Sequence, residues 1–234
     1  MSVDGLVVSE VFGPTLQGEG PHAGQPVGFI RLGGCNLHCS WCDTAYTWDA
    51  SRFDLRMELG RRSVDNILDH VRGMGVDRVV ISGGEPLLHQ DQPGWGELLR
   101  RLDRDGIAID VETNGTINPV SSPVDLFVVS PKLAHSGDPL DLRINPAALD
   151  TFAALATYTN RAVFKIVCTT TDDVREAAAL VDRLGVPIEF LWVMPEGTSA
   201  DTLARPDIAE AAIAVGANFT TRLHTLLWGQ ERAR

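Results

Sequence analysis

The feature that most limits the possible folds of this chain is a series of short apolar runs separated by longer amphipathic segments. Each run is almost continuously hydrophobic, as expected of parallel strands that are covered on both faces. Two clear examples are RVVISG (78–83) and AVFKIV (162–167). The predicted strands are 27–32, 78–83, 107–112, 125–130, 162–167 and 188–193.

The segments between these runs show helical periodicity. In SVDNILDHVRGMG the apolar residues Val64, Ile67, Leu68 and Val71 share one face, and Ser63 is suited to cap the first turn. Further helices are predicted over 94–106, 172–185 and 200–214. Strands that alternate with helices predict an α/β fold with a mostly parallel sheet, wound as a partial barrel or as an open doubly wound sheet.

Length and charge narrow the functional class. The 234 residues fit one domain, 1–234, and the net charge of −11 comes without a basic stripe, which argues against a nucleic-acid partner. No apolar run approaches the length of a membrane span, and the start MSVDGLVVSEVFG lacks the pattern of a signal peptide. We therefore expect a cytoplasmic protein, not bound to a membrane, whose cysteines stay reduced and whose partner is a small molecule or another protein.

Glycines, prolines and polar side chains gather at the ends of the predicted strands. The carboxyl ends of parallel strands meet at one edge of a sheet or barrel, and that edge carries the active site in such folds. We therefore expect the active site where these segments converge. They are GGCNLHCSWC (33–42), GGEP (83–86), ETNG (112–115), SPK (130–132) and MPEG (194–197).

Three of the four cysteines, Cys35, Cys39 and Cys42, form a C-x3-C-x2-C pattern in the first of these segments. A cubane iron–sulfur cluster takes one external ligand on each iron, so three cysteines leave one iron open to a substrate or cofactor. The alternative is a zinc site completed by His38 or by Cys168. Cys168, near the end of a predicted strand, is more typical of a buried core residue.

The cysteine pattern on an α/β core, together with GGEP, resembles the radical S-adenosylmethionine (SAM) superfamily. The resemblance implies a partial TIM-type barrel of mostly parallel strands, the radical SAM core, that holds a [4Fe-4S] cluster. In that superfamily SAM chelates the open iron through its amino and carboxyl groups, and one electron from the cluster cleaves SAM to a 5′-deoxyadenosyl radical. The cofactors carry the chemistry in such enzymes, and the protein orients them.

Further segments extend the pattern over most of the chain. They are LQGEG (16–20), G-x-P (24–26), FIRL-x-GCNL (29–37), WCDT-x-YTW (41–48), SGGEP (82–86), ETNGT (112–116), SPK (130–132) and RLHTLLWG (222–229). Together they resemble the 7-carboxy-7-deazaguanine synthase family. The resemblance implies conversion of 6-carboxy-5,6,7,8-tetrahydropterin into 7-carboxy-7-deazaguanine with loss of ammonia, in 7-deazapurine (queuosine-type) biosynthesis. It also implies that the radical takes hydrogen from C6 of the pterin, that SAM is regenerated, and that Mg2+ is required.

The resemblance assigns residues to the cofactors. Cys35, Cys39 and Cys42 are expected to hold the cluster. Thr44 is expected to give its hydroxyl oxygen to Mg2+, a cation that prefers oxygen ligands, whereas without the resemblance it would be interpreted as a turn or cap residue. Residues expected to contact SAM are Trp41, Cys42, Asp43, Gly84, Asn114, Ser130, Pro131, Lys132, Val193, Met194, Pro195 and Glu196.

The pterin is expected to contact a second set of residues. Glu19 would accept hydrogen bonds from its guanidine-like N–H groups, and Arg31 would pair with its carboxylate in a bidentate fork. A structural salt bridge is the alternative for Arg31, and a structural role in an apolar run is the alternative for His224. The full set is Leu16, Gln17, Gly18, Glu19, Arg31, Ser82 and His224.

Two other functions remain open from the sequence. One is another radical SAM enzyme, such as a glycyl-radical activating enzyme, which would not need a carboxylate-binding arginine at Arg31. The other is a zinc-stabilised module without catalysis. The resemblance further implies a homodimer and a flavodoxin- or ferredoxin-type reductant, whereas the chain end after Gly229 departs from the family pattern.

Overall fold

The computed structural model describes residues 5–233, so residues 1–4 and 234 of the predicted domain lie outside the described residues. One nine-stranded sheet has the order β3-β1-β2-β4-β5-β6-β7-β8-β9. The strands are β1 (Leu6–Leu16), β2 (Pro26–Leu32), β3 (Gly60–Arg62), β4 (Arg78–Gly83), β5 (Ala108–Thr113), β6 (Leu126–Val129), β7 (Ala162–Cys168), β8 (Leu191–Pro195) and β9 (Asn218–Phe219).

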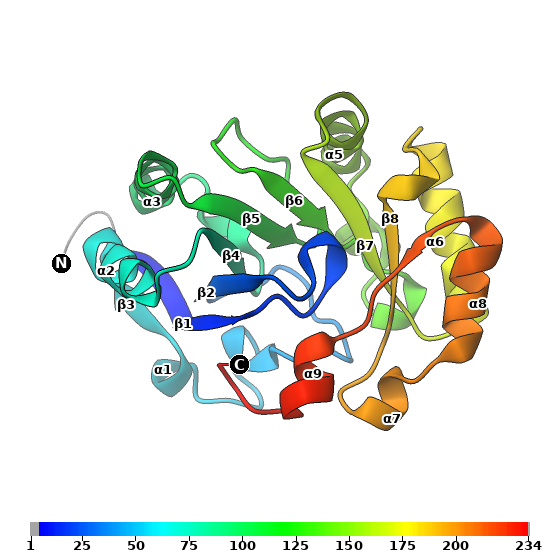
Figure 1. Cartoon of the computed structure of the whole chain (residues 1–234), viewed down its shortest axis with the longest axis horizontal. Helices are drawn as coiled ribbons and strands as arrows, with labels where there is room; N and C mark the ends of the chain where they lie inside the picture. The colour runs from blue at the N-terminus through cyan, green and yellow to red at the C-terminus, as the bar shows by residue number, and fades with distance from the viewer. Residues whose placement is uncertain (1–4, 234) are drawn as a thin grey trace.

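The sheet is mostly parallel, as predicted. From β2 through β4 to β9 each neighbouring pair is parallel, whereas β1 is antiparallel to β2 and to β3 at one edge. The sheet curves without closing on itself, which makes it a partial barrel (Figure 1).

The helices confirm most of the predicted segments. Ser63 caps α2 by accepting a hydrogen bond from the backbone N–H of Asn66 at 3.2 Å, and Gly75 ends the helix in the left-handed region. The helices are α1 (Leu55–Glu58), α2 (Val64–Met74), α3 (Pro93–Arg104), α4 (Leu140–Arg143), α5 (Pro146–Thr159), α6 (Thr171–Arg183), α7 (Ala200–Leu203), α8 (Pro206–Val215) and α9 (Leu223–Trp228). Short 3-10 turns are η1 (Gly20–His22), η2 (Ala45–Thr47), η3 (Pro86–His89), η4 (Ala134–Ser136) and η5 (Ile188–Phe190).

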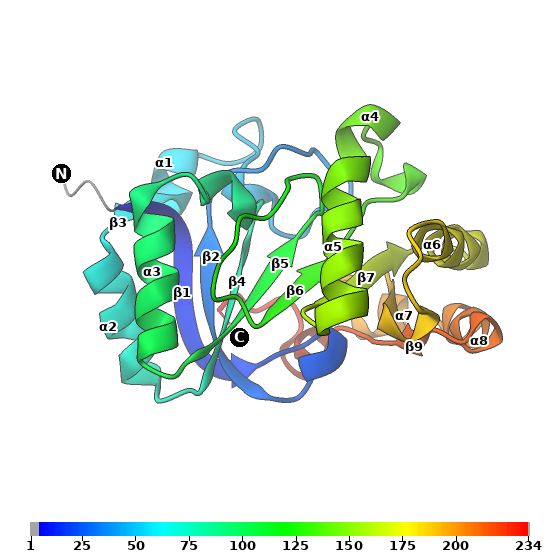
Figure 2. The same ribbon diagram turned by 90° about the horizontal axis from the view of Figure 1, so that it is seen from above.

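Helices α2, α3, α5, α6 and α8 cover the outer face of the curved sheet (Figures 1 and 2). The core lies between them and the sheet, and Trp95, Phe152 and Phe164 are among its largest fully buried side chains. Helix α9 lies instead across the opening between β1 and β8 (Figure 1). Among the described residues, no helix has the length and apolar character needed to cross a membrane.

Two predicted boundaries were wrong, and proline explains both. Residues 188–190 form the turn η5 after Pro187, whose carbonyl accepts from the N–H of Phe190 at 3.0 Å, so the strand begins only at Leu191. The predicted helix 200–214 is divided into α7 and α8 because Pro206 cannot continue a helix and starts a new one. The helix α5 was not predicted at all.

Candidate active site

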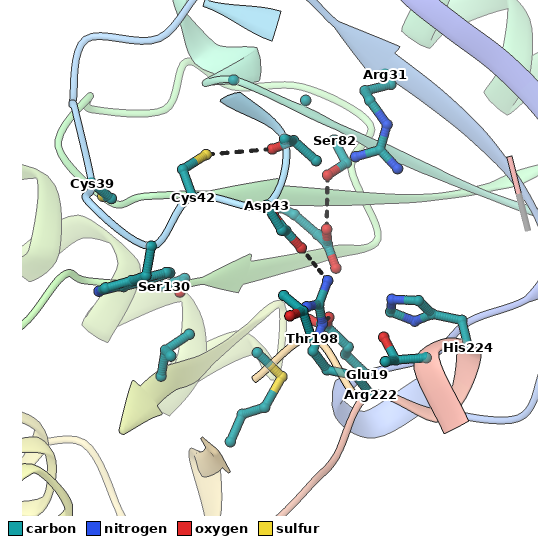
Figure 3. Close-up of a pocket in the computed structure, with 18 of the residues that line it drawn as sticks. Glu19, Arg31, Cys39, Cys42, Asp43, Ser82, Ser130, Thr198, Arg222 and His224 are labelled. Atoms are coloured by element: carbon teal, nitrogen blue, oxygen red, sulfur yellow. Dashed lines mark hydrogen bonds and ion pairs between the residues drawn. The ribbon is translucent and has the colours of Figure 1, made fainter. Parts of the chain in front are cut away.

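A cavity of about 530 Å3 opens on the face of the sheet that the outer helices leave uncovered. Side chains alternate along a strand, so Ser82, Glu112 and Lys165 face the cavity while their neighbours Ile81 and Val111 join the core. The predicted convergence of the segments that follow the strands is confirmed, because all five contribute to the lining. Figure 3 shows how their side chains lie.

Most residues predicted to have a role line this cavity, although the roles themselves stay predictions. Gly18, Pro131 and Val193 do not line it. Val193 is fully buried in the core, and Gly18 lies behind His224. The predicted residues in the lining are Leu16, Gln17, Glu19, Arg31, Cys35, Cys39, Trp41, Cys42, Asp43, Thr44, Ser82, Gly84, Asn114, Ser130, Lys132, Met194, Pro195, Glu196 and His224.

The three clustered cysteines are free thiols that line the cavity together. Burial raises the pKa of Cys35 to about 11 and that of Cys39 to about 12, so each stays protonated at pH 7 until a metal displaces the proton. Among the described residues no three His, Cys, Asp or Glu side chains surround a single-ion site. A cubane takes each thiolate on a different iron, so its ligand sulfurs need not meet at one point.

Neither of the two further ligands considered for zinc joins these cysteines in the cavity. The side chain of His38 is 68% exposed. Cys168 is fully buried in the hydrophobic core at the end of β7, as predicted. Neither of the two side chains considered as the fourth ligand is therefore placed to complete a zinc site with the three thiols.

Hydrogen bonds from distant segments hold the loop that carries the cysteines. Asn114 donates from Nδ2 to Oδ1 of Asn36 at 3.0 Å, and Asn36 donates to the hydroxyl of Thr116 at 2.8 Å. The carboxylate of Asp138 accepts from the backbone N–H of His38 at 3.0 Å. Asn114, predicted to contact SAM, thus also positions the cysteine loop, and Asp138 is a support that the sequence reasoning missed.

The GGEP segment packs directly under the same loop. A Cβ on Gly84 would lie 1.9 Å from the carbonyl oxygen of Gly34, so this close approach requires glycine. Glu85 is buried and accepts from the N–H of Asn114 at 2.6 Å and from the hydroxyl of Thr113 at 2.8 Å. Burial raises the pKa of Glu85. Glu85 therefore fixes the ETNG turn against the GGEP turn.

A cation lies beside the cysteines on the side predicted for SAM. Lys132 donates from Nζ to the hydroxyl of Ser130 at 2.9 Å, and Nζ is 5.3 Å from the centroid of the Trp41 ring. The indole N–H of Trp41 is buried and finds no hydrogen-bond partner among the described residues. A positive charge, a hydroxyl and a free indole donor are suited to an anionic, polar ligand.

Glu19 lies between two cations in the cavity lining. Lys165 pairs with Glu19, and Arg222 donates from Nε to Oε1 of Glu19 at 3.1 Å. Burial alone would raise the pKa of Glu19, but Lys165 and Arg222 outweigh it and hold this pKa well below the usual carboxyl range. Glu19 is therefore an ionised hydrogen-bond acceptor.

Glu112 is a second, half-buried acceptor that shares Lys165 with Glu19. It accepts from the hydroxyl of Ser82 at 2.8 Å and lies 3.3 Å from Nζ of Lys165. Gln17 donates to it over 3.5 Å. Sequence reasoning assigned no role to Glu112, Lys165 or Arg222. The signal for Lys165 was present, because a charge inside the apolar run AVFKIV has the same burial cost as Arg31 in FIRL.

Arg31 occupies a different part of the cavity from Glu19 (Figure 3). Its Nε donates to Oε2 of Glu10 at 3.0 Å, so the structural salt bridge that the sequence left open is present. The guanidinium carbon lies 5.6 Å from the centroid of the Phe12 ring. Arg31 also lines the cavity, so a role toward an anionic substrate stays a prediction.

His224, on α9, packs against the backbone of Gly18. A Cβ at Gly18 would lie 1.9 Å from Nδ1 of His224, and the N–H of Leu223 donates to the carbonyl of Gly18 at 2.9 Å. Burial lowers the pKa of His224 and favours the neutral imidazole. This contact fastens α9 to the segment that carries Glu19.

The chain end also lines the cavity. Arg232 pairs with Glu10 at 3.1 Å and with Glu58 at 3.0 Å, and its guanidinium carbon lies 3.8 Å from the centroid of the Tyr46 ring. The segment after Gly229, which departs from the sequence pattern, thus lies over the site.

Comparisons with known proteins agree with this geometry. Residues 29–128 match the model of the radical SAM superfamily. A 7-carboxy-7-deazaguanine synthase of Pyrobaculum aerophilum is 35% identical over 97% of this chain and 96% of its own length. That of Bacillus subtilis is 31% identical over 97% of this chain and 98% of its own.

The fold matches as well. The crystal structure of QueE from Escherichia coli superposes with a TM-score of 0.70 and 28% sequence identity, over 94% of this chain and 95% of that one. Similarity over nearly the full length of both chains is thus found in sequence and in structure. The chain therefore belongs to the 7-carboxy-7-deazaguanine synthase family of the radical SAM superfamily.

Proposed function

We propose that this protein converts 6-carboxy-5,6,7,8-tetrahydropterin into 7-carboxy-7-deazaguanine and ammonia, in 7-deazapurine biosynthesis of the queuosine type. The observation that carries the proposal is that one cavity combines three free thiols with Glu19 and Arg31, in a chain similar to synthases over nearly its full length. A cluster ligand set and a set of groups complementary to a carboxylated pterin thus line the same cavity.

The residues present fit a [4Fe-4S] cluster and SAM. Cys35, Cys39 and Cys42 would hold the cluster, and Lys132 with Ser130 would bind the anionic and hydroxyl groups of SAM. When bound, these groups supply a carbon-centred radical that can remove a hydrogen atom from the substrate. The chain itself would contribute the orientation of both ligands.

Roles on the substrate side follow from charge and hydrogen-bonding capacity. Ionised Glu19 would accept from the amino-pyrimidinone N–H groups of the pterin, and Lys165 keeps it ionised. Arg31 would pair with the carboxylate at the other end of the ring system. Arg31 and Glu19 occupy different parts of the cavity, so the two ends of one pterin are expected to contact them (Figure 3).

Thr44 is proposed as the protein ligand of Mg2+. Its hydroxyl oxygen lines the cavity 3.7 Å from Sγ of Cys42. Mg2+ typically takes one or two protein oxygens and keeps several waters, so a single hydroxyl beside the substrate suits it. An ion at this place would help to orient the substrate.

Several further properties belong to the proposal. The chain would form one domain over 1–234, act in the cytoplasm as a homodimer, and receive electrons from a flavodoxin- or ferredoxin-type protein. These expectations rest on the family resemblance.

An anaerobic assay tests the reaction. Reconstituted protein is mixed with SAM, dithionite, Mg2+ and 6-carboxytetrahydropterin, and the products are read by mass spectrometry. The proposal predicts 7-carboxy-7-deazaguanine, absent when SAM is omitted. Formation of 5′-deoxyadenosine alone would favour another radical SAM enzyme, and a colourless protein that contains zinc would favour the non-catalytic module.

A further inference from the structure

Arg222 is the one residue among the described part of the chain that bonds to Glu19, to Asp43 and to the loop after β8. It donates from Nε to Glu19 at 3.1 Å and from Nη1 to the carbonyl oxygen of Gly197 at 2.9 Å. Its Nη2 donates to Asp43, as the dashed line in Figure 3 shows. Glu19 and Asp43 belong to two segments near the start of the chain, whereas Gly197 lies in the loop after β8, so Arg222 joins three separate segments of the cavity lining.

The two carboxylates that Arg222 joins belong to different halves of the proposed site. Glu19 faces the pterin position, whereas Asp43 directly follows Cys42 in the cysteine loop, where SAM would lie. The side chain of Arg222 is 13% exposed and that of Asp43 is 40% exposed. The bridge is therefore held firmly at the Glu19 end and reaches a more accessible group at the other.

Packing makes the Glu19 end move as one unit with Arg222. The backbone of Leu223 bonds to the carbonyl of Gly18 at 2.9 Å, and the imidazole of His224 rests on Gly18. The N–H of Gly20 donates to the hydroxyl of Thr220 at 2.9 Å. A displacement of Arg222 therefore displaces the segment that carries Glu19.

We propose that Arg222 is a positioning residue that transmits SAM binding at the cysteine loop to the substrate-binding Glu19. SAM fixes the cysteine loop and with it Asp43, so Arg222 and Glu19 lose freedom before the substrate arrives. The substrate then binds with less ordering cost, and by reciprocity the substrate strengthens SAM binding. The planar fork of arginine suits this role, because a lysine offers only one point charge to three acceptors.

Hydrogen exchange tests this proposal without turnover. The reconstituted protein is incubated with and without SAM, with no reductant, and exchange is followed in peptides that cover 17–20 and 222–225. In the wild type SAM slows exchange there by about fivefold or more, the lower range of allosteric coupling. In Arg222→Gln the same peptides exchange alike with and without SAM, and Arg222→Lys gives an intermediate effect.

Arg205→Gln is the matched control. Arg205 also bridges loops, since it pairs with Asp207 at 2.6 Å and bonds to the carbonyl of Thr169 at 3.0 Å, but it does not line the cavity. It should keep the wild-type response. The proposal would be overturned if SAM slowed exchange in Arg222→Gln as much as in the wild type, or if SAM had no effect on exchange in the wild type. If Arg222→Gln does not fold, a full wild-type response in Arg222→Lys overturns it.

This inference rests on the proposed position of SAM beside Asp43, and its failure can be told from failure of the proposed reaction. If SAM slows hydrogen exchange at 17–20 and 222–225 but the assay yields no 7-carboxy-7-deazaguanine, the proposed reaction is refuted and the coupling stands. If the wild type forms the product but SAM does not slow hydrogen exchange in these peptides, only the coupling is refuted. If the two sites are coupled, SAM also lowers the dissociation constant of the pterin in the wild type and leaves it unchanged in Arg222→Gln.

Discussion

Arg31 and Glu10 face each other directly across the antiparallel pair β1–β2, and Nε of Arg31 donates to Oε2 of Glu10 at 3.0 Å. Within residues 5–233 the two terminal nitrogens of Arg31 have no hydrogen-bond partner. The salt bridge thus holds the guanidinium through Nε and leaves its two terminal nitrogens available to a ligand in the cavity. Structural and binding roles, which the sequence presented as alternatives, are compatible in one side chain.

Replacement of Arg31 by Gln should mainly weaken substrate binding. A hydrogen-bonded charge pair contributes roughly 1.5–3 kcal/mol, so we expect the KM for the pterin to rise by about ten- to a hundredfold. The cluster content should stay unchanged. Steady-state kinetics with varied pterin measures the effect.

Arg52→Gln is the control for Arg31→Gln, because Arg52 pairs with Asp49 at 2.5 Å on an exposed loop. It should leave KM unchanged. Equal pterin affinity in wild type and Arg31→Gln would eliminate the carboxylate-binding role of Arg31.

Replacement of Cys39 by Ala should abolish cluster assembly and turnover. Two thiolates cannot take the place of three, so the anaerobic protein should lose its brown colour and its bound iron and sulfide. Cys168→Ala removes the fourth cysteine, which is buried in the core, and should keep both the cluster and the activity. Iron and sulfide analysis of both variants measures the cluster content. An intact cluster in Cys39→Ala would contradict the assignment of Cys39 as a cluster ligand.

Replacement of Thr44 by Val should preserve the cluster and weaken the response to Mg2+. Loss of a ligand oxygen should raise the Mg2+ concentration for half-maximal activity by about tenfold or more. Thr44→Ser keeps the hydroxyl and should behave like the wild type. A Mg2+ titration of all three proteins makes the comparison, and identical curves for Thr44→Val and wild type would remove Thr44 from the metal site.

The pKa of Glu19 predicts a stability loss in acid. This pKa lies below the ordinary value of 4.5 in the folded protein, so below that pH the unfolded chain takes up a proton that the folded chain does not. The stabilisation is complete above 4.5 and is lost as the pH falls toward the folded pKa. Glu19→Gln should flatten this dependence, by at most about 1.4 kcal/mol per pH unit.

Urea unfolding of the metal-free protein between neutral pH and about pH 3.5 measures the slope for Glu19. Asp172 pairs with Arg175 on an exposed turn of α6, so Asp172→Asn serves as the control and should leave the slope nearly unchanged. Equal slopes in Glu19→Gln and wild type would mean that the two cations do not hold this carboxylate ionised.

The strands were predictable because strands buried on both faces have nearly continuous hydrophobic sequences. Helix α5 was missed because its residues are apolar around much of the circumference, with Tyr158 82% exposed, so the polar face that marks other helices is weak. The boundaries at Pro187 and Pro206 were misplaced because the apolar and helical patterns continue across positions where proline starts a new element.

The positions of the site residues were predictable from motifs, whereas their pairings were not. Lys165 and Glu19 are separated by 146 positions in the chain, and only the curvature of the sheet brings them together. The partners of Arg222 were not predictable either. Arg222 begins the segment RLHTLLWG, in which only His224 was predicted to have a role in the site. A sequence shows that a buried charge needs a partner but does not show which one.

The most direct test of the central claim follows one hydrogen atom. Substrate deuterated at C6 is turned over anaerobically, and SAM is then recovered and examined by mass spectrometry. If this chain starts the ring contraction at C6 and regenerates SAM, deuterium appears in the 5′ position of the recovered SAM, because only one of three equivalent methyl hydrogens returns. Product formation with all deuterium absent from SAM and from 5′-deoxyadenosine would contradict the account.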